Sequence, residues 1–299
     1  MTTDNDRYIA AVGMFDGLHA GHLFVLGKLR ALAESRGLRP MVISFANHPA
    51  EILSPAKTPR LIAGPEEKKE LIRTLAGIGR VEIVPFTAGF AAMTAADFLS
   101  NLKSRGIGVL AMGFNNHIGS DRLTAAEASA LGIIDIIALP PCPGGHDLSS
   151  SALRCAIENA DFATAAAILS RPYSIEGTVV PGRQLGRKIG YPTANIEIED
   201  AQRRLLPPDG VYAADVTVDR DPAVYRAMVN IGRRPTVDNS AAPLRTIEAH
   251  ILALSADLYS RRISLTFLRR LRDERRFPSI EALKAQLALD AEAARNTEL

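Results

Sequence analysis

The stretch Gly13-Met14-Phe15-Asp16-Gly17-Leu18-His19-Ala20-Gly21-His22 decides the fold of the first half of the chain. The apolar run Tyr8–Val12 precedes it, and a helical pattern with Val25, Leu29 and Leu32 on one face follows it. This order predicts a strand, a tight loop and the start of a helix. A helix N-terminus beside a glycine-rich turn favours an anion, because its free N–H groups and the helix dipole attract negative charge. The loop is therefore predicted to bind the phosphates of a nucleotide.

Two histidines in this stretch strengthen the prediction of a phosphate site. His19 and His22 are three residues apart, so they share one face of the predicted helix. Imidazole groups there can donate hydrogen bonds to a phosphoryl group whose charge grows during a reaction. A metal site with Asp16 or His48 as a third ligand is a second interpretation, and a purely structural histidine pair is a third. The glycines of the loop leave its backbone open to a ligand, which favours the phosphate site.

The composition is that of a globular protein with room for two domains. The chain has 299 residues, of which 47% are hydrophobic and 23% charged, and its net charge is +2. This balance gives no argument for nucleic acid or for a membrane surface as a partner. Residues 1–7 lack the pattern of a signal peptide, and two cysteines are too few for a disulfide framework. We expect a cytoplasmic protein that acts on small molecules, with self-association left open.

The first half of the chain alternates short apolar runs with helical patterns. The predicted strands are 8–12, 41–45, 81–84, 109–112 and 133–139, and the helices between them begin near 20, 65, 94 and 124. Such alternation predicts a mainly parallel sheet with helices on both faces. Ligands of these sheets bind beyond the carboxyl ends of the strands. The opening loop, His48 and Asn115 all fall at such ends.

The pattern changes near Arg171-Pro172, where we place the boundary between a domain 1–170 and a domain 171–299. The predicted strands of the second domain are 175–180, 211–218, 227–231, 246–252 and 263–267. Their alternation and the turn signals between them suit a small antiparallel barrel. A terminal helix follows Pro278, with Ser279 as its N-cap.

Three further sites have both a structural and a functional interpretation. Ser149-Ser150-Ser151 before Arg154 is a capped helix start, or a set of hydroxyl groups and a guanidinium that bind one phosphate. The stretch 182–195 is a basic hairpin loop, or a glycine-rich phosphate cradle in which Thr193 and Asn195 supply hard oxygen ligands for Mg²⁺. Glu248 is a solvated strand residue, or a base that takes a proton from a hydroxyl nucleophile.

Taken together, these motifs resemble the bacterial bifunctional riboflavin kinase/FAD synthetase family over nearly the whole chain. The resemblance rests on motifs in a fixed order: GMFDGLHAGH (13–22), SFANHP (44–49), LSSSALR (148–154), GTVVPGRQLGRKIGYPTANI (177–196), NIGRRPTV (230–237), IEAHIL (247–252) and DLYSRRISLTFLRRLRDERRF (257–277). It implies an N-terminal Rossmann-like nucleotidyltransferase domain and a C-terminal six-stranded antiparallel β-barrel kinase domain. The implied activities are phosphorylation of riboflavin to FMN with ATP, and adenylylation of FMN to FAD with release of pyrophosphate.

The resemblance also assigns roles to particular residues. It implies that Glu248 is the base of the kinase, that His19 and His22 stabilise the adenylyl transition state, and that Thr193 and Asn195 hold Mg²⁺. The nucleotide-binding residues that we predict for the first domain are Gly13, Phe15, Asp16, Gly21, His48, Asn115, Ser150, Ser151 and Arg154. Those of the second domain are Gly182, Arg187, Gly190, Thr193 and Asn195.

One segment departs from the family pattern and keeps an alternative open. Where the family has a pattern like GxDFxFG, this chain reads Gly113-Phe114-Asn115-Asn116-His117-Ile118-Gly119, so that Asn116 and Ile118 replace two phenylalanines. The alternative is a riboflavin kinase whose nucleotidyltransferase domain is degenerate or regulatory. A flavin-binding scaffold and a nucleotidyltransferase with another acceptor are two further alternatives.

Overall fold

The computed structural model describes residues 8–144, 148–182, 185–233 and 245–298. Arg183 and Gln184 of the predicted phosphate cradle, and residues 234–237 of the family motif, lie outside the described residues. The contacts between Cα atoms divide the chain into two compact units, Met1–Ser150 and Ser151–Leu299. The division falls inside helix α7 (Ser150–Glu158), about twenty residues before the boundary that the sequence predicts. The domain bounds 1–170 and 171–299 remain a prediction.

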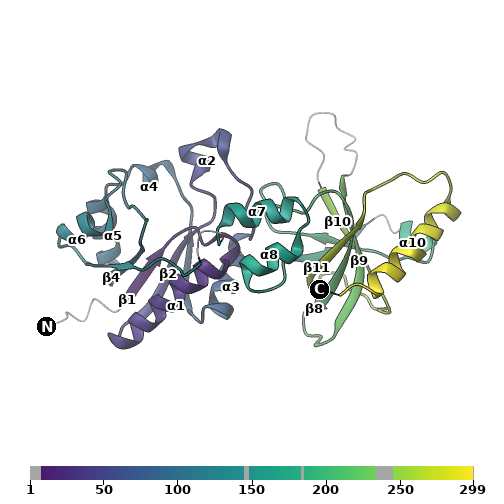
Figure 1. The fold of residues 1–299 in the computed structure, drawn as a ribbon, viewed down its shortest axis with the longest axis horizontal. Coiled ribbons are helices and arrows are strands. Elements are labelled where there is room, and N and C mark those ends of the chain that lie inside the picture. Colours follow the sequence, from purple (N-terminus) through teal and green to yellow (C-terminus); the bar gives the residue numbers. More distant parts are fainter. Residues whose placement is uncertain (1–7, 145–147, 183–184, 234–244, 299) are drawn as a thin grey trace. The chain divides into compact units, whose positions relative to one another are not determined.

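The first unit is a five-stranded parallel sheet in the order β3-β2-β1-β4-β5 (Figure 1). Its strands are β1 (Tyr8–Val12), β2 (Arg39–Phe45), β3 (Arg80–Val84), β4 (Ile107–Gly113) and β5 (Asp135–Leu139). The first strand is central and pairs with β2 on one side and β4 on the other. The chain therefore changes direction across the sheet at β1 and β4, and a crevice opens beyond their carboxyl ends. This arrangement confirms the α/β fold predicted from the sequence.

Helices cover both faces of this sheet. Successive side chains of β1 point to opposite faces, and both faces of the strand are apolar. Ile9 and Ala11 belong to a core beneath α1 (Ala20–Ser35) and α3 (Pro65–Leu75). Ala10, between them, belongs to a second core beneath α5 (Ala95–Ser104) and α6 (Ala125–Ala130). The shorter elements are η1 (Asp16–Leu18), α2 (Ala50–Leu53), η2 (Pro55–Lys57) and α4 (Ala88–Ala92).

The second unit is a closed antiparallel barrel in the order β10-β7-β6-β11-β8-β9 (Figure 1). Its strands are β6 (Ser174–Val180), β7 (Ala194–Glu197), β8 (Gly210–Val218), β9 (Val224–Arg233), β10 (Arg245–Ile251) and β11 (Arg262–Arg272). Its helices are α8 (Phe162–Leu169), α9 (Leu185–Lys188) and α10 (Ile280–Arg295), besides α7. The barrel confirms the predicted fold of the second half. Strand β7 was not predicted from the sequence, in which only its residue Asn195 was considered, as a possible ligand.

Aromatic side chains fill the barrel core. The ring of Phe162 on α8 stacks on Phe267 at 5.4 Å and lies 6.2 Å from Tyr173. Tyr212 packs edge-on against Phe267 at 5.5 Å, and its hydroxyl donates a hydrogen bond to the carbonyl of Pro208. Burial raises the pKa of Tyr212 to about 12. The described interior of the barrel is thus apolar and packed with aromatic rings.

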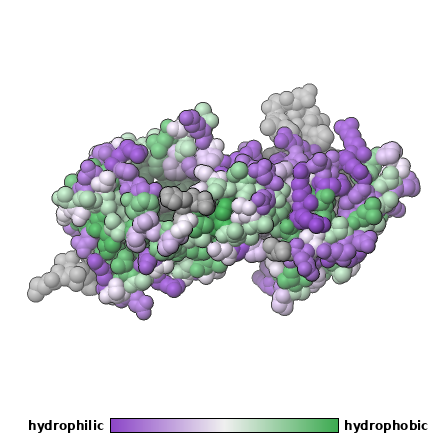
Figure 2. Space-filling view, in the orientation of Figure 1, coloured by the Kyte–Doolittle hydropathy of each residue, from purple (hydrophilic) through white to green (hydrophobic). Residues whose placement is uncertain are grey.

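The surface and the helices agree with the composition of a globular protein. In the part of the chain that the structure describes, no helix has both the length and the apolar character needed to span a bilayer. Figure 2 shows hydrophilic residues crowded over the visible face of the barrel unit.

Two glycines of the first unit provide a test of its packing. Gly119 has φ +75°, and a Cβ added there would lie 2.2 Å from the backbone nitrogen of Ala95 at the start of α5. Gly132 has φ +64°, but a Cβ added there would meet nothing within 4 Å. Gly132→Ala should cost about 1–2 kcal/mol, the cost of a left-handed conformation. Gly119→Ala should cost about 1–3 kcal/mol more, because it also overpacks the backbone.

Hydrogen exchange of peptides from β1 and β4 measures the free energy of opening of this unit separately from the barrel. Equal losses in the two variants would contradict the close approach of Gly119 to α5.

Candidate functional sites

The histidine loop leaves β1 with an unusual backbone conformation. Phe15, Gly17 and Leu18 have φ values of 46°, 74° and 43°, and two of these residues are not glycine. Non-glycine residues persist in this region only where their surroundings hold them, and such residues often lie at functional sites. At the beginning of the loop, the N–H of Gly13 donates to the carbonyl of Ile43 at 3.1 Å. The loop is therefore fixed against β2 before it enters α1.

Asp16 holds the loop from the inside. Its side chain is only 1% exposed, and its carboxylate accepts hydrogen bonds from the N–H groups of Ile62 (2.9 Å) and Ala63 (3.1 Å). The hydroxyl of Ser150 donates to the Asp16 carbonyl at 3.3 Å. The Asp16 carboxylate thus binds the backbone of the segment before α3, and it supports the loop from beneath. Direct contact of Asp16 with a nucleotide remains a prediction.

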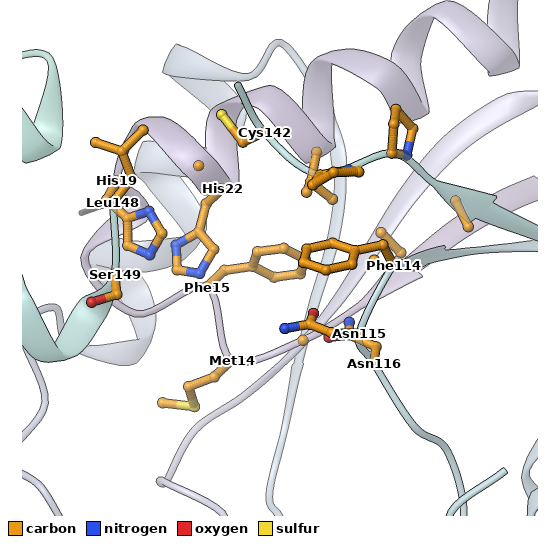
Figure 3. A pocket seen from close by; sticks show the side chains of 18 of the residues that line it. Met14, Phe15, His19, His22, Phe114, Asn115, Asn116, Cys142, Leu148 and Ser149 are labelled. Atoms are coloured by element: carbon orange, nitrogen blue, oxygen red, sulfur yellow. The ribbon is translucent and has the colours of Figure 1, made fainter. Parts of the chain in front are cut away.

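His19 and His22 form a stacked pair at the start of α1. Their ring centroids are 3.6 Å apart with an angle of 22° between the ring planes, and His22 meets the edge of Phe15 at 5.4 Å. His19 occupies the N-cap position and is 5% exposed. Figure 3 shows both imidazoles beside Ser149 at one side of a cavity. The first turn of α1 thus brings two imidazoles and a helix N-terminus to one place.

This histidine cavity has a volume of about 610 Å³, within the usual range for a small-molecule site. Of the predicted residues of the first domain, those that line it are Gly13, Phe15, His19, Gly21, His22 and Asn115. Phe114, which is 63% exposed, and Cys142 also line it (Figure 3). The cavity opens where the loops after β1 and β4 meet, as the sheet topology predicts.

Other predicted residues of the first domain lie elsewhere. His48 follows β2, and its Nδ1 accepts a hydrogen bond from the N–H of Ala50 at the start of α2. It is not among the residues that line the histidine cavity. Ser151 is exposed and Arg154 is half-buried, and both belong to the second compact unit. Their predicted role beside the histidine loop remains a prediction.

A second, aromatic cavity of about 600 Å³ adjoins the histidine cavity, with which it shares Val12, Gly13, Ala111 and Asn116. Four phenylalanines line it: Phe45, Phe86, Phe90 and Phe98. Their neighbouring rings are 5.2 to 5.8 Å apart, mostly edge to face. Sequence reasoning missed this cluster, although the run FTAGF (86–90) contains two of its members.

On the barrel, strand register gathers the predicted kinase residues. Glu248 on β10 lies directly opposite Asn195 on β7 and opposite Asn230 on β9. Opposite residues of antiparallel strands point to the same face. The neighbours of Glu248 on β10, Ile247 and Ala249, are buried in the barrel. Glu248, Asn195 and Asn230 therefore form a row on the outer face.

Glu248 and Asn230 of this row line a barrel cavity of about 620 Å³, whereas Asn195 is not among its lining residues. Its polar side includes Thr193, Asn230, Glu248, His250 and Glu274. Its apolar side is formed by Tyr191, Met228, Phe277, Ile280, Leu283 and Leu287, of which the last three lie on α10. The cavity can accommodate a ligand with a flat apolar body and a polar end.

Glycines let the loop before β7 approach the barrel closely. A Cβ at Gly182 would lie 1.9 Å from the Asn195 amide nitrogen, and one at Gly186 would lie 2.2 Å from the Tyr191 carbonyl oxygen. Gly182 thus leaves room for Asn195, which is 9% exposed. Arg187 and Gly190 are exposed on α9 and on the turn after it.

His250 is a site residue that sequence reasoning missed. Its Nδ1 lies 2.7 Å from the carbonyl oxygen of Pro192, and its ring packs against the edge of Tyr191 at 5.2 Å. These contacts attach the segment before Thr193 to β10. His250 could have been found from its position two residues after Glu248, because side chains two residues apart on a strand point to the same face.

The α/β unit and the barrel each have a cavity lined by several of the predicted site residues. The FAD synthetase family model matches residues 1–132, and the riboflavin kinase family model matches residues 169–298. A curated relative from Escherichia coli (strain K12), described as a bifunctional riboflavin kinase/FMN adenylyltransferase, is 36% identical over 296 residues, which cover 96% of this chain and 91% of the relative. A relative of the same description from Bacillus subtilis (strain 168) is 30% identical, covering 96% and 92%.

A solved structure from Streptococcus pneumoniae, described as a macrolide-efflux protein, has a TM-score of 0.82 and 31% sequence identity, covering 99% of this chain and 96% of that one. The similarity to the curated relatives extends over nearly all of both chains. The chain belongs to the bifunctional riboflavin kinase/FMN adenylyltransferase family.

The role of Asp16 gives a prediction about the histidine loop. Asp16→Ala should destabilise the first unit by about 3 kcal/mol, because buried N–H groups of Ile62 and Ala63 lose their acceptor. The control is Asp135→Ala, which removes an exposed carboxylate whose Oδ2 lies 3.5 Å from Nη1 of Arg36. This change should alter the stability of the unit by less than about 0.5 kcal/mol. Hydrogen exchange of peptides from the first unit measures both. A loss as small as that of the control would contradict the anchoring role.

Proposed function

We propose that this chain makes FMN from riboflavin on its barrel and converts FMN to FAD on its α/β unit. The observation that carries the proposal is Glu248, which lies opposite Asn195 in the strand register and lines a cavity with one polar and one apolar side. Riboflavin has matching parts, a flat apolar ring system and a polyhydroxyl chain that ends in the reacting hydroxyl. The descriptions of the curated relatives support the same pair of activities.

In the kinase reaction, the terminal ribityl hydroxyl of riboflavin attacks the γ-phosphorus of ATP, and ADP leaves. Glu248 accepts the proton of that hydroxyl as the new O–P bond forms. The apolar side of the cavity, which includes Met228 and Phe277, holds the ring and excludes water. The hydrogen bond between His250 and Pro192 keeps Thr193 in place beside Glu248.

Thr193 and Asn195 suit the Mg²⁺ that accompanies a nucleotide. Thr193 directly precedes β7 and Asn195 is the second residue of that strand, so the two lie close together along the chain. Gly182 leaves the space that the Asn195 side chain occupies. A hydroxyl and an amide oxygen are hard ligands, and Mg²⁺ commonly takes few protein ligands and completes its coordination with phosphates and water. When bound, the metal ion would neutralise charge on the phosphates.

In the second reaction, a phosphate oxygen of FMN attacks the α-phosphorus of ATP, and pyrophosphate leaves. His19 and His22, at the N-terminus of α1, would donate hydrogen bonds to the phosphoryl oxygens as their charge grows. The adjoining aromatic cavity of Phe45, Phe86, Phe90 and Phe98 would hold the flavin ring. These phenylalanines offer aromatic packing that Asn116 and Ile118 cannot supply.

Substitutions in the two units should separate the two activities. Glu248→Gln should lower FMN formation from riboflavin by about 10²–10⁴-fold, the usual contribution of a general base. The same variant should form FAD from added FMN at the normal rate. His22→Ala should do the opposite, with normal FMN formation and little FAD. Chromatography of the flavins formed with ATP and Mg²⁺ measures both.

A matched control is Glu197→Gln, an exposed carboxylate on β7 that does not line the barrel cavity and should leave both activities unchanged. Normal FMN formation by Glu248→Gln would contradict its role as the base. If the unaltered chain forms FMN from riboflavin but forms no FAD, even when FMN is added, the result would favour the alternative of a degenerate or regulatory first domain.

A further inference from the structure

The barrel cavity contains a polar pair outside the set of residues that the proposed chemistry uses. The side-chain amide of Asn230 donates a hydrogen bond from Nδ2 to Oε1 of Glu274 at 2.9 Å. Both residues line the cavity. Asn230 lies directly opposite Glu248 in the register of β9 and β10. Because neighbouring strands are about 4.8 Å apart, Asn230 is one strand spacing from the proposed base.

Several contacts fix the segment that bears Glu274. Arg272 forms a bidentate ion pair with Asp290 on α10, at 2.7 and 3.1 Å. The ring of Phe277 lies beneath the guanidinium groups of Arg272 and Arg275, whose carbon atoms are 5.6 and 4.9 Å from its centroid. The backbone that bears Glu274 is thus anchored on both sides of this residue, and its exposed carboxylate lies at the wall of the cavity.

A glycine on β9 makes room for this carboxylate. A Cβ added at Gly232 would lie 2.1 Å from Oε1 of Glu274 and 2.8 Å from Oε2. Glu274 therefore lies directly over the Gly232 backbone, two residues along β9 from Asn230. The obstacle to such a Cβ is the end of a flexible side chain, so an alanine at Gly232 would displace the carboxylate with little effect on the strand.

The hydrogen bond between the two side chains leaves most of their capacity unused. Glu274 still has lone pairs on both oxygens, and Asn230 has a carbonyl oxygen and a second N–H. An adjacent acceptor and donor of this kind suit hydroxyl groups, and a carboxylate makes the stronger, charge-assisted hydrogen bonds. We infer that Asn230 and Glu274 bind the internal hydroxyl groups of the ribityl chain and thereby select a flavin with a polyhydroxyl side chain.

This inference rests on the proposed kinase activity and adds a specificity device to it. The ring fits the apolar side of the cavity, and the terminal hydroxyl must reach Glu248. The chain between them has to pass the wall on which Asn230 and Glu274 lie. When a flavin without internal hydroxyl groups binds, these polar side chains lose hydrogen bonds to water and gain none in return, so the binding of that flavin is disfavoured. The pair is therefore expected to act on discrimination between substrates, while proton transfer stays with Glu248.

The test compares two substrates in the full-length chain. One is riboflavin, and the other is a flavin with a 5-hydroxypentyl chain on the same nitrogen, which keeps the terminal hydroxyl and lacks the internal ones. The unaltered chain should prefer riboflavin by at least about 100-fold in kcat/KM for phosphorylation. Glu274→Gln and Gly232→Ala should each lower kcat/KM for riboflavin about 10-fold or more and leave that for the analogue nearly unchanged.

The control is Asp273→Asn, which removes the neighbouring carboxylate, paired with Arg270 at 2.7 Å and outside the cavity. It should leave the preference intact. An equal loss on both substrates in Glu274→Gln and Gly232→Ala, or no loss on either, would overturn the inference while the kinase activity stands. An unaltered chain that phosphorylates neither flavin would overturn the proposed function, and the inference with it.

Discussion

The register of β10 between β7 and β9 is the constraint on which the barrel site depends. It places Glu248 opposite Asn195 on one side and Asn230 on the other. Side chains alternate along a strand, so a shift of one residue would turn Glu248 into the apolar interior and Ile247 outward. Closure of the barrel fixes this register, because each strand is paired on both edges. The positions of the proposed base, the proposed metal ligand and the proposed hydroxyl-binding amide thus follow from backbone pairing.

In the α/β unit, buried polar contacts and backbone conformation play the corresponding part. Asp16 is buried so that it can bind the amides of Ile62 and Ala63, and this holds a loop in which Phe15 and Leu18 have positive φ. The cost of that backbone is balanced by the contacts around it. The result is a helix N-terminus with two imidazoles at the carboxyl end of the central strand, where α/β sheets bind ligands.

Much of this was predictable from the sequence, and the failures have physical reasons. Alternating patterns and the N-cap Ser279 located most elements, because such signals depend on neighbours in the chain. β7 was missed because four residues carry too little periodicity. The contact of His250 with Pro192, and that of Asn230 with Glu274, join segments 44 to 58 residues apart, so they follow only from the folded register. The inward direction of Asp16 was equally hidden, since a loop aspartate is usually exposed.

The most direct test of the account is a crystal structure of the full chain with riboflavin and ADP. The account predicts the isoalloxazine ring against Met228 and Phe277, the terminal ribityl oxygen within hydrogen-bonding distance of the Glu248 carboxylate, and the ADP phosphates at Thr193. Such a structure would place the reacting atoms on the outer face of the barrel, beside strands β7, β10 and β9. A flavin bound elsewhere on the barrel, with its terminal oxygen remote from Glu248, would contradict the central claim.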